Sequence, residues 1–213
     1  MKPLNIQQFK YGAVISLIVA LLLFFASYKM GKNEFFLLLN TNQGKVADYF
    51  LGIFTNAGDA SMWVVVLFIT LFVLKQKQAW PLLLSGFVVS TIFTQVCKYV
   101  IMPNAPRPWA AIQNHSLLHY VSFITPLLKS SFPSGHTATA FSIYLILCLL
   151  LQKKWWLWVG LIYALLVGYS RIYLAQHFPF DVAAGMFVGV LTVLISLPIQ
   201  LWAVRKSRNV FYV

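Results

Sequence analysis

Charged side chains are scarce in this chain of 213 residues. Only 16 residues are Lys or Arg and four are Asp or Glu, so 9% of the chain is charged while 60% is apolar. Soluble globular domains usually carry about a quarter of their residues as charged side chains. The deficit excludes an ordinary soluble domain and points to a membrane protein.

Acids and cysteines are the rarest groups. The four carboxylates form no acidic cluster that would hold a metal ion, and we expect neither a metal nor another cofactor. Cys97 and Cys148, the two cysteines, fall in apolar runs far apart in the sequence. This placement favours inert buried thiols over a disulfide.

The uncharged stretches are long. A helix needs about 20 apolar residues to cross the hydrocarbon core of a bilayer. Six intervals approach or reach this length: 11–28, 60–74, 78–97, 130–152, 155–170 and 182–204. The second and fifth are short, and we expect them to extend into polar flanks. The pattern predicts an all-α polytopic membrane protein in which residues 1–213 form one domain, a bundle of six transmembrane helices.

The first interval follows the segment MKPLNIQQFK, an order that resembles a secretory signal peptide. Its length and the lack of a small-x-small cleavage site in FFASYKM favour a retained helix. We therefore expect residues 11–28 to form the first span.

The net charge of +12 would suit a nucleic-acid-binding protein, but its distribution does not. With the N-terminus in the cytoplasm, six spans place these basic residues on the cytoplasmic side: Lys2, Lys10, Lys75, Lys77, Lys153, Lys154, Arg205, Lys206 and Arg208. Lys and Arg concentrate in cytoplasmic loops, so this orientation is the favoured one. We predict cytoplasmic termini and no nucleic-acid partner.

Two longer segments fall on the outer side. Residues 32–60 alternate apolar clusters with polar residues and predict a short helix in the membrane interface. Residues 102–131 carry four prolines and predict an irregular start. Within this segment His115 and His119 have the i,i+4 spacing of metal ligands but no third partner, which favours a loop surface or a substrate contact.

A small-residue pair lies in the last interval. Gly185 and Gly189 form a G-x-x-x-G pattern. Small residues let two helices approach closely, and we favour packing within the bundle over dimerisation.

Polar residues gather in three places at the ends of the predicted spans. Six spans that alternate in direction bring all three clusters to the outer face. The cluster residues are Lys98 and Arg107 after the third span, Pro133, Ser134, Gly135 and His136 at the start of the fourth, and Arg171, His177 and Asp181 between the fifth and sixth. Ionisable residues at membrane depth are functional candidates by default.

The cations at this level indicate a phosphate ligand. Lys98, Arg107 and Arg171 converge with few acids nearby, and Arg matches phosphate oxygens bidentately. Pro133 suits the first turn of a helix. Ser134 and Gly135 would then lie at its N-terminus, where free N–H groups attract anions.

The two histidines suit two different roles. Asp181 lies one turn from His177 and can fix its tautomer, which leaves the other ring nitrogen as a nucleophile. His136 can protonate a leaving oxygen. Activity would need His177 neutral and His136 protonated, which predicts a bell-shaped pH profile.

These residues resemble the signature of the type 2 phosphatidic acid phosphatases. These are integral-membrane lipid phosphatases that share a site with vanadium haloperoxidases and glucose-6-phosphatase. The family pattern has three parts: Lys-x6-Arg-Pro, Pro-Ser-Gly-His and Ser-Arg-x5-His-x3-Asp. Here the second part is present whole at residues 133–136, and the third is present whole as Ser170, Arg171, His177 and Asp181.

The first part of the pattern departs from the family. Eight residues rather than six separate Lys98 from Arg107. We assign the two extra residues to the segment MPNAP, beyond the helix end, where insertions are tolerated. Arg107 keeps its place next to Pro108, and the long stem of Lys98 has to absorb part of the shift.

The resemblance implies a role for each residue. His177 would be the nucleophile that forms a phosphohistidine, oriented by Asp181, and His136 would protonate the leaving lipid oxygen and then activate water. The residues that would bind the phosphoryl oxygens are Lys98, Arg107, Ser134, Gly135 and Arg171. The resemblance implies no metal.

We therefore predict a metal-independent lipid phosphatase of a bacterial inner membrane, with its active site on the periplasmic or extracellular face. By resemblance, undecaprenyl diphosphate and phosphatidylglycerophosphate are the favoured substrates, with phosphatidic acid and lipid A phosphates as further candidates. Two alternatives stay open: a phosphotransferase that uses the same histidine, and an anionic-lipid-binding or transport protein. Six spans without broken or repeated segments argue against transport. The sequence predicts no oligomeric state.

Overall fold

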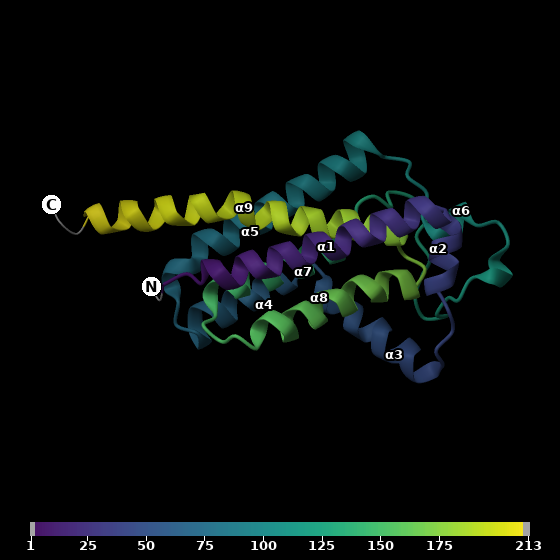
Figure 1. Cartoon of the computed structure of the whole chain (residues 1–213), viewed down its shortest axis with the longest axis horizontal. Helices are drawn as coiled ribbons and strands as arrows, with labels where there is room; N and C mark the ends of the chain where they lie inside the picture. The colour runs from purple at the N-terminus through teal and green to yellow at the C-terminus, as the bar shows by residue number, and fades with distance from the viewer. Residues whose placement is uncertain (1–2, 211–213) are drawn as a thin grey trace.

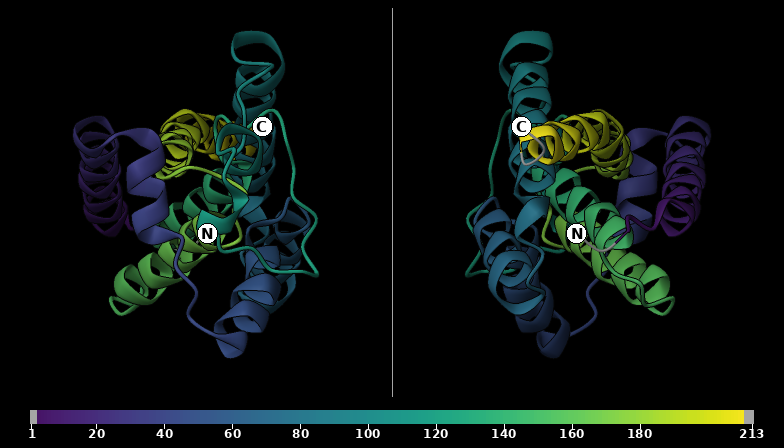
Figure 2. Two further views of the ribbon diagram at one scale, coloured as in Figure 1. Left: turned by 90° about the vertical axis from the view of Figure 1, so that its right-hand side faces the viewer. Right: turned by 90° about the vertical axis from the view of Figure 1, so that its left-hand side faces the viewer.

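The computed structural model describes residues 3–210. Lys2 and the side chain of Arg208, both used above to predict orientation, lie outside the described part. Figures 1 and 2 show long helices packed along a common axis. The helices are α1 (Ile6–Met30), α2 (Lys32–Leu39), α3 (Lys45–Phe54), α4 (Met62–Phe68), α5 (Trp80–Val96), α6 (Pro108–Ala111), α7 (Gly135–Leu150), α8 (Trp156–Tyr173) and α9 (Pro179–Val210).

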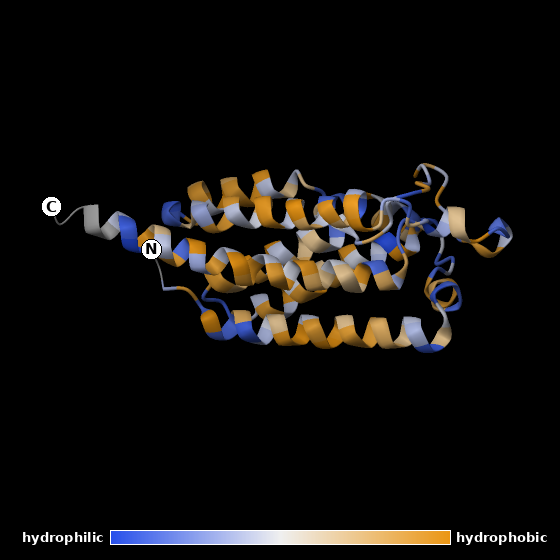
Figure 3. Ribbon diagram, turned by 90° about the horizontal axis from the view of Figure 1, so that it is seen from above, coloured by the Kyte–Doolittle hydropathy of each residue, from blue (hydrophilic) through white to orange (hydrophobic). Residues whose placement is uncertain are grey.

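Four helical segments are long and apolar enough to cross a membrane. They are Ile6–Met30, Lys77–Ile101, Trp156–Tyr173 and Pro179–Ser207, which correspond to four of the six predicted intervals. Hydrophobic residues cover much of these helices, and hydrophilic ones gather toward the two ends of the bundle (Figure 3). The prediction of a helical membrane protein is confirmed.

Residues 60–74, predicted as one span, form half of a bent pair. The segments Lys45–Gly58 and Met62–Val73 meet at 66° and are together long and apolar enough for one crossing. The expectation that no span is broken is therefore wrong. The break lies at Asp59, whose backbone is extended (φ −67°, ψ 157°) and whose Oδ1 accepts a hydrogen bond from the N–H of Ser61 at 2.8 Å. Such an Asx turn competes locally with the helix.

The interval 130–152 forms α7, a helix of only 16 residues. It starts later than predicted because Ser134 acts as its N-cap, so residues 130–134 stay outside the helix. From Thr137 to Leu150 all residues except Leu147 are buried. By length and composition the described chain thus has four candidate spans, or five with the bent pair, and α7 is a shorter apolar helix.

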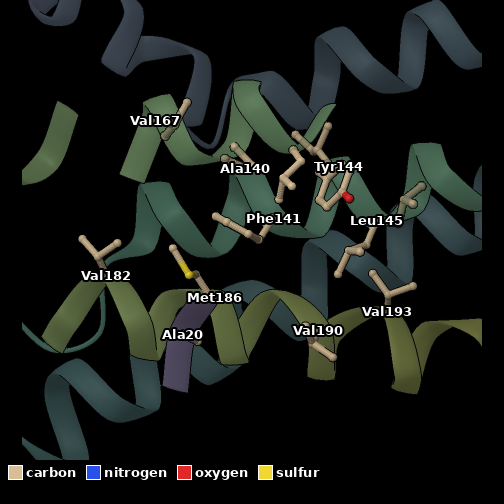
Figure 4. Close-up of a cluster of buried hydrophobic side chains, with 14 of the residues drawn as sticks. Ala20, Ala140, Phe141, Tyr144, Leu145, Val167, Val182, Met186, Val190 and Val193 are labelled. Carbon is tan, nitrogen blue, oxygen red and sulfur yellow. The ribbon is translucent and has the colours of Figure 1, made fainter. Parts of the chain in front are cut away.

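Helix α7 lies at the centre of the bundle, packed against α1, α5, α8 and α9. Figure 4 shows Phe141 and Tyr144 of α7 in the same apolar cluster as Met186 and Val190 of α9. Its neighbours therefore shield α7 from lipid along most of its length.

Two glycines set the spacing of α7 and α9. A Cβ at Gly185 would lie 2.6 Å from the carbonyl oxygen of Ser134, and one at Gly189 would lie 2.6 Å from Cβ of Phe141. Both distances are shorter than contacts that real Cβ atoms make. The prediction of close packing within the bundle is confirmed, and it brings the start of α7 against the start of α9.

Candidate functional site

The three polar segments meet at the end of the bundle that carries α2, α3 and α6 (Figure 1). One is the π-helical turn Cys97–Ile101, which continues α5. The second is the start of α7, and the third is the link between α8 and α9. The residues predicted from the sequence to form one site therefore lie together.

Ser134 organises the start of α7. Its hydroxyl oxygen accepts from the N–H of Thr137 at 3.4 Å and from the Thr137 hydroxyl at 2.8 Å, while its own N–H donates to the carbonyl of Asp181 at 3.0 Å. Pro133 precedes this cap instead of lying in the first helical turn. The N–H groups of Gly135 and His136 lie in the first turn, where helix geometry offers them no acceptor, so they are available to an anion.

Arg107 ties two loops together from a buried position. Its Nε donates to the carbonyl of Lys129 and its Nη1 to the carbonyl of Gln176, both at 2.9 Å. The residue is 5% exposed. These bonds fix a guanidinium beside the link between α8 and α9.

The same guanidinium reaches His177. Nη1 of Arg107 lies 3.3 Å from Nε2 of His177, a residue that is 1% exposed. Because Arg only donates, Nε2 has to be the accepting nitrogen, and the ring proton sits on Nδ1. Burial lowers the pKa of His177 well below its usual range, and the positive charges of Arg107, Arg171 and Lys98 lower it further. His177 is therefore neutral at neutral pH.

Asp181 lies next to His177 but is not hydrogen-bonded to it. Oδ2 of Asp181 is 3.7 Å from Nδ1 of His177, beyond hydrogen-bond length. That oxygen accepts instead from the hydroxyl of Ser131 and from the N–H of Phe178. Within the described part of the chain, Nδ1 of His177 and Oδ1 of Asp181 have no hydrogen-bond partner. A small ring movement would bring Nδ1 within hydrogen-bond distance of Oδ2, and catalytic hydrogen bonds often shorten only when the substrate binds.

Lys98 reaches the start of α7 despite the longer spacing to Arg107. Its Nζ lies 3.7 Å from the position that a Cβ on Gly135 would occupy. The π-helical turn that carries Lys98 adds residues to the helix end without lengthening it as an α-helix would. The ammonium group thus lies beside the free N–H groups of this helix.

Arg171 occupies the end of α8 and is 7% exposed. Its Nη1 donates to the hydroxyl of Thr55 at 2.6 Å, and its buried Nε has no hydrogen-bond partner among the described residues. A buried guanidinium with a spare donor is costly unless a ligand satisfies it. An anion in the site would do so.

His136 and Lys98 open onto a cavity of about 300 Å³. Asp59 and Gly135 also line it. A second groove of about 440 Å³ lies between α4 and α5 and is lined almost entirely by apolar side chains. Ala60, Trp63 and Phe87 line both, so the polar cavity and the apolar groove adjoin each other.

The other two histidines, His115 and His119, do not join this site. Nε2 of His119 lies 2.9 Å from Oδ1 of Asp48, and Nε2 of His115 lies 3.0 Å from the carbonyl of Trp109. No group of three metal-ligating side chains occurs among the residues that the structure describes. The interpretation of these histidines as loop residues agrees with their contacts.

Known proteins share these features. Residues 78–205, which include every motif segment, match the PAP2 superfamily. The chain belongs to the PAP2 superfamily. It is 30% identical over 167 residues to an undecaprenyl-diphosphatase of Sulfolobus acidocaldarius, covering 78% of this chain and 77% of that protein.

Two further PAP2 comparisons agree. A lipid A 4'-phosphatase of Bacteroides thetaiotaomicron is 27% identical over 149 residues, which are 67% of this chain and 64% of that protein. The crystal structure of Aquifex aeolicus LpxE superimposes with a TM-score of 0.65 at 30% identity, covering 76% of this chain and 92% of that one. The protein is accordingly a PAP2 lipid phosphate hydrolase.

Three site residues of this PAP2 protein were missed by sequence reasoning. Thr55 binds Arg171, Ser131 binds Asp181, and Asp59 lines the cavity beside His136. Ser131 stands two residues before Pro133, so its closeness to the motif was a signal. Thr55 and Asp59 belong to the polar segment TNAGD, where an apolar stretch is interrupted, and such a break was a further signal.

Proposed function

We propose that this protein hydrolyses a membrane lipid phosphate or diphosphate without a metal, through a phosphohistidine on His177. One observation carries the proposal: Arg107 lies buried beside the neutral His177, while Lys98 and His136 line a polar cavity that adjoins an apolar groove. A phosphate group fits the polar cavity and a hydrocarbon chain fits the groove. A water-soluble phosphate ester would make no use of the groove.

Five residues would bind the phosphoryl oxygens. Arg107 and Arg171 supply guanidinium donors, and Lys98 supplies an ammonium group close to Gly135. The backbone at Ser134 and Gly135 forms the N-terminus of α7, which favours negative charge. Donors aimed at a phosphoryl group before it reacts stabilise the charge that spreads over its oxygens in the transition state.

Two steps complete the reaction. Nε2 of His177 bonds to phosphorus as the bond from phosphorus to the leaving oxygen breaks, and His136 gives its proton to that oxygen. A water molecule then gives a proton to His136, and its oxygen bonds to phosphorus as the phosphorus–nitrogen bond breaks. Asp181 stabilises the positive charge that develops on the ring of His177.

The substrate we favour is undecaprenyl diphosphate or phosphatidylglycerophosphate, with phosphatidic acid and lipid A phosphate as further candidates. Their chains would lie against Val64, Leu67 and Leu84, which line the apolar groove. Val64 and Leu84 are themselves exposed on the surface of the bundle, so the groove is open toward lipid. Chains in the bilayer would thus enter without leaving it.

We further propose that the single domain crosses a bacterial inner membrane six times, with the bent pair and α7 as two of the crossings. The start of α1 and the end of α9 lie at the same end of the bundle (Figure 1), which an even number of crossings requires. Lys153, Lys154, Arg205 and Lys206 belong to that end, and the positive-inside rule favours it for the cytoplasm. The site would then face the periplasm or the outside of the cell.

Phosphate release tests the proposal. The purified protein in detergent with EDTA is given each of the four lipids, alongside His177→Ala and the control His115→Ala. We expect wild type and the control to release phosphate and His177→Ala to lose at least about 10³-fold in rate, as when a nucleophile is removed. Release that EDTA abolishes, or that survives His177→Ala, would contradict the mechanism.

The same assay distinguishes a hydrolase from the two alternatives, a phosphotransferase and an anionic-lipid-binding or transport protein. A phosphotransferase would release no inorganic phosphate from the lipid alone and would form a phosphorylated product when a second lipid acceptor is added. A lipid-dependent function that persists in His177→Ala would identify binding or transport, because binding relies on the arginines and not on the nucleophile.

A further inference from the structure

The 3₁₀ turn Thr55–Gly58 contacts two residues of the site, Arg171 and His136. Thr55 accepts a hydrogen bond from Arg171, as described above. A Cβ on Gly58 would lie 2.8 Å from the carbonyl oxygen of His136 and 3.1 Å from its Cβ, so the backbone of the turn touches that residue. The residue that follows the turn, Asp59, is therefore held beside His136.

Asp59 and His136 line the same cavity as Lys98. Asp59 is the one acidic residue among the residues that line it. One carboxylate oxygen is held by the N–H of Ser61, which fixes the direction of the side chain. A hydrogen bond from a backbone N–H stabilises the charged form of a carboxylate. The carboxylate is thus ionised at neutral pH.

The other charges that act on His136 are all cations within the described chain. They are Arg171 at the end of α8, Lys98 in the turn after α5, and Arg107 in the loop that follows. Three cations favour the neutral imidazole, whereas a general acid has to carry a proton. A carboxylate beside the ring is the protein group that opposes them.

Resting on the phosphatase function proposed above, we propose that Asp59 is a positioning residue for His136. Its carboxylate orients the imidazole and favours the protonated ring, so that the proton faces the leaving lipid oxygen. Asp59 neither bonds to phosphorus nor takes up the proton: the proton passes from His136 to the leaving oxygen and returns to His136 from water. The role is specific to the step in which the leaving group departs.

A pair of substrates with different leaving groups tests this role. A lipid phosphate monoester such as phosphatidic acid expels an alkoxide that needs a proton, whereas p-nitrophenyl phosphate expels a phenolate that hardly needs one. Asp59→Asn keeps an oxygen that accepts from the N–H of Ser61, so the Asx turn is retained while the charge is lost. We expect Asp59→Asn to lower kcat for the lipid by about 10-fold or more, since a general acid contributes about 10²–10⁴-fold. The loss for p-nitrophenyl phosphate should be much smaller.

Three further measurements separate positioning from folding. His136→Ala should show the same pattern of substrates, and Asp59→Glu should recover part of the lipid activity. The alkaline limb of the kcat profile should move to lower pH in Asp59→Asn, because the ring loses its proton more readily. Glu34→Gln, at an exposed acid on α2, is the matched control and should behave as wild type.

The outcomes are distinct. Equal losses on both substrates, or no loss on either, would overturn the role of Asp59. If Asp59→Asn does not fold, Asp59→Ser keeps a side-chain acceptor for the turn and gives the same comparison. Failure of wild type to release phosphate from any lipid would overturn the proposed function instead, before the variant is considered.

Discussion

Nη1 of Arg107 lies 3.3 Å from Nε2 of His177, while the same guanidinium donates to the carbonyls of Lys129 and Gln176. The arginine thereby selects the tautomer in which Nε2 carries the lone pair. It also covers that lone pair. A phosphate that binds Arg107 would draw the donor toward its own oxygens and free the nitrogen for attack. Phosphate binding and activation of the nucleophile are thus coupled through one side chain.

The lowered pKa of His177 predicts where activity is lost in acid. Burial, followed by the charges of Arg107 and Arg171, keeps this histidine neutral as the pH falls through about 6.5, the usual value for His. We expect the acid limb of kcat/KM to have its midpoint below that value, measured in a series from about pH 4 to pH 9. A midpoint at or above the usual value, or a flat profile in acid, would contradict the assignment.

The same shift has a consequence for stability. In the unfolded chain His177 binds a proton near its ordinary pKa, whereas in the folded chain it binds that proton only at lower pH. The contribution of His177 to the free energy of unfolding is therefore fully present above about pH 6.5, and it is lost as the pH falls toward the pKa of the folded state. Thermal unfolding should show a smaller acid loss in His177→Gln than in wild type.

Lys98→Met tests whether the lysine contributes to phosphate binding. The substitution keeps the apolar stem and removes the ammonium group beside Gly135. We expect kcat/KM to fall by about 10- to 100-fold, since hydrogen bonds to charged groups contribute about 1.5–3 kcal/mol. Lys45→Met, at an exposed lysine on α3, is the control. Unchanged kinetics in Lys98→Met would show that the longer spacing to Arg107 removes the lysine from the site.

The residues of the site were easier to predict than the helices that hold them. The scarcity of charge and the long uncharged, apolar intervals identify α1, α5, α8 and α9, because a lipid-facing helix has to be apolar throughout its length. The 16 residues of α7 escape that rule, since α7 is covered by other helices and the run 130–152 does not show where Ser134 caps it. Contacts such as Thr55 to Arg171 join positions 116 residues apart and depend on the tertiary fold.

Gly185 tests the packing of the start of α9 against the start of α7, which holds His177 near His136. A Cβ there would lie 2.6 Å from the carbonyl of Ser134 and 2.8 Å from Cβ of Thr137, and neither neighbour is a flexible chain end. We expect Gly185→Ala to destabilise the protein by about 1–3 kcal/mol through overpacking and to lower kcat by separating His136 from His177. Leu194→Ala, at a half-exposed residue of the same helix, should cost less. Thermal unfolding and phosphate release measure the two effects, and a Gly185→Ala variant with wild-type values for both would contradict them.

Gly86 tests the apolar groove. A Cβ at this position would lie 2.9 Å from the ring of Trp63 and 2.9 Å from Ile146, so a larger side chain has to displace the indole. Trp63 lines both the polar cavity and the groove, and a displaced ring would change the shape of the wall that they share. We expect Gly86→Val to raise KM for long-chain lipids by about 10-fold, the cost of losing one or two buried methylene contacts per chain. KM for a short-chain or aryl phosphate should stay near the wild-type value, because such substrates do not enter the groove. A loss that is the same at every chain length would show that the groove is not where the chain binds.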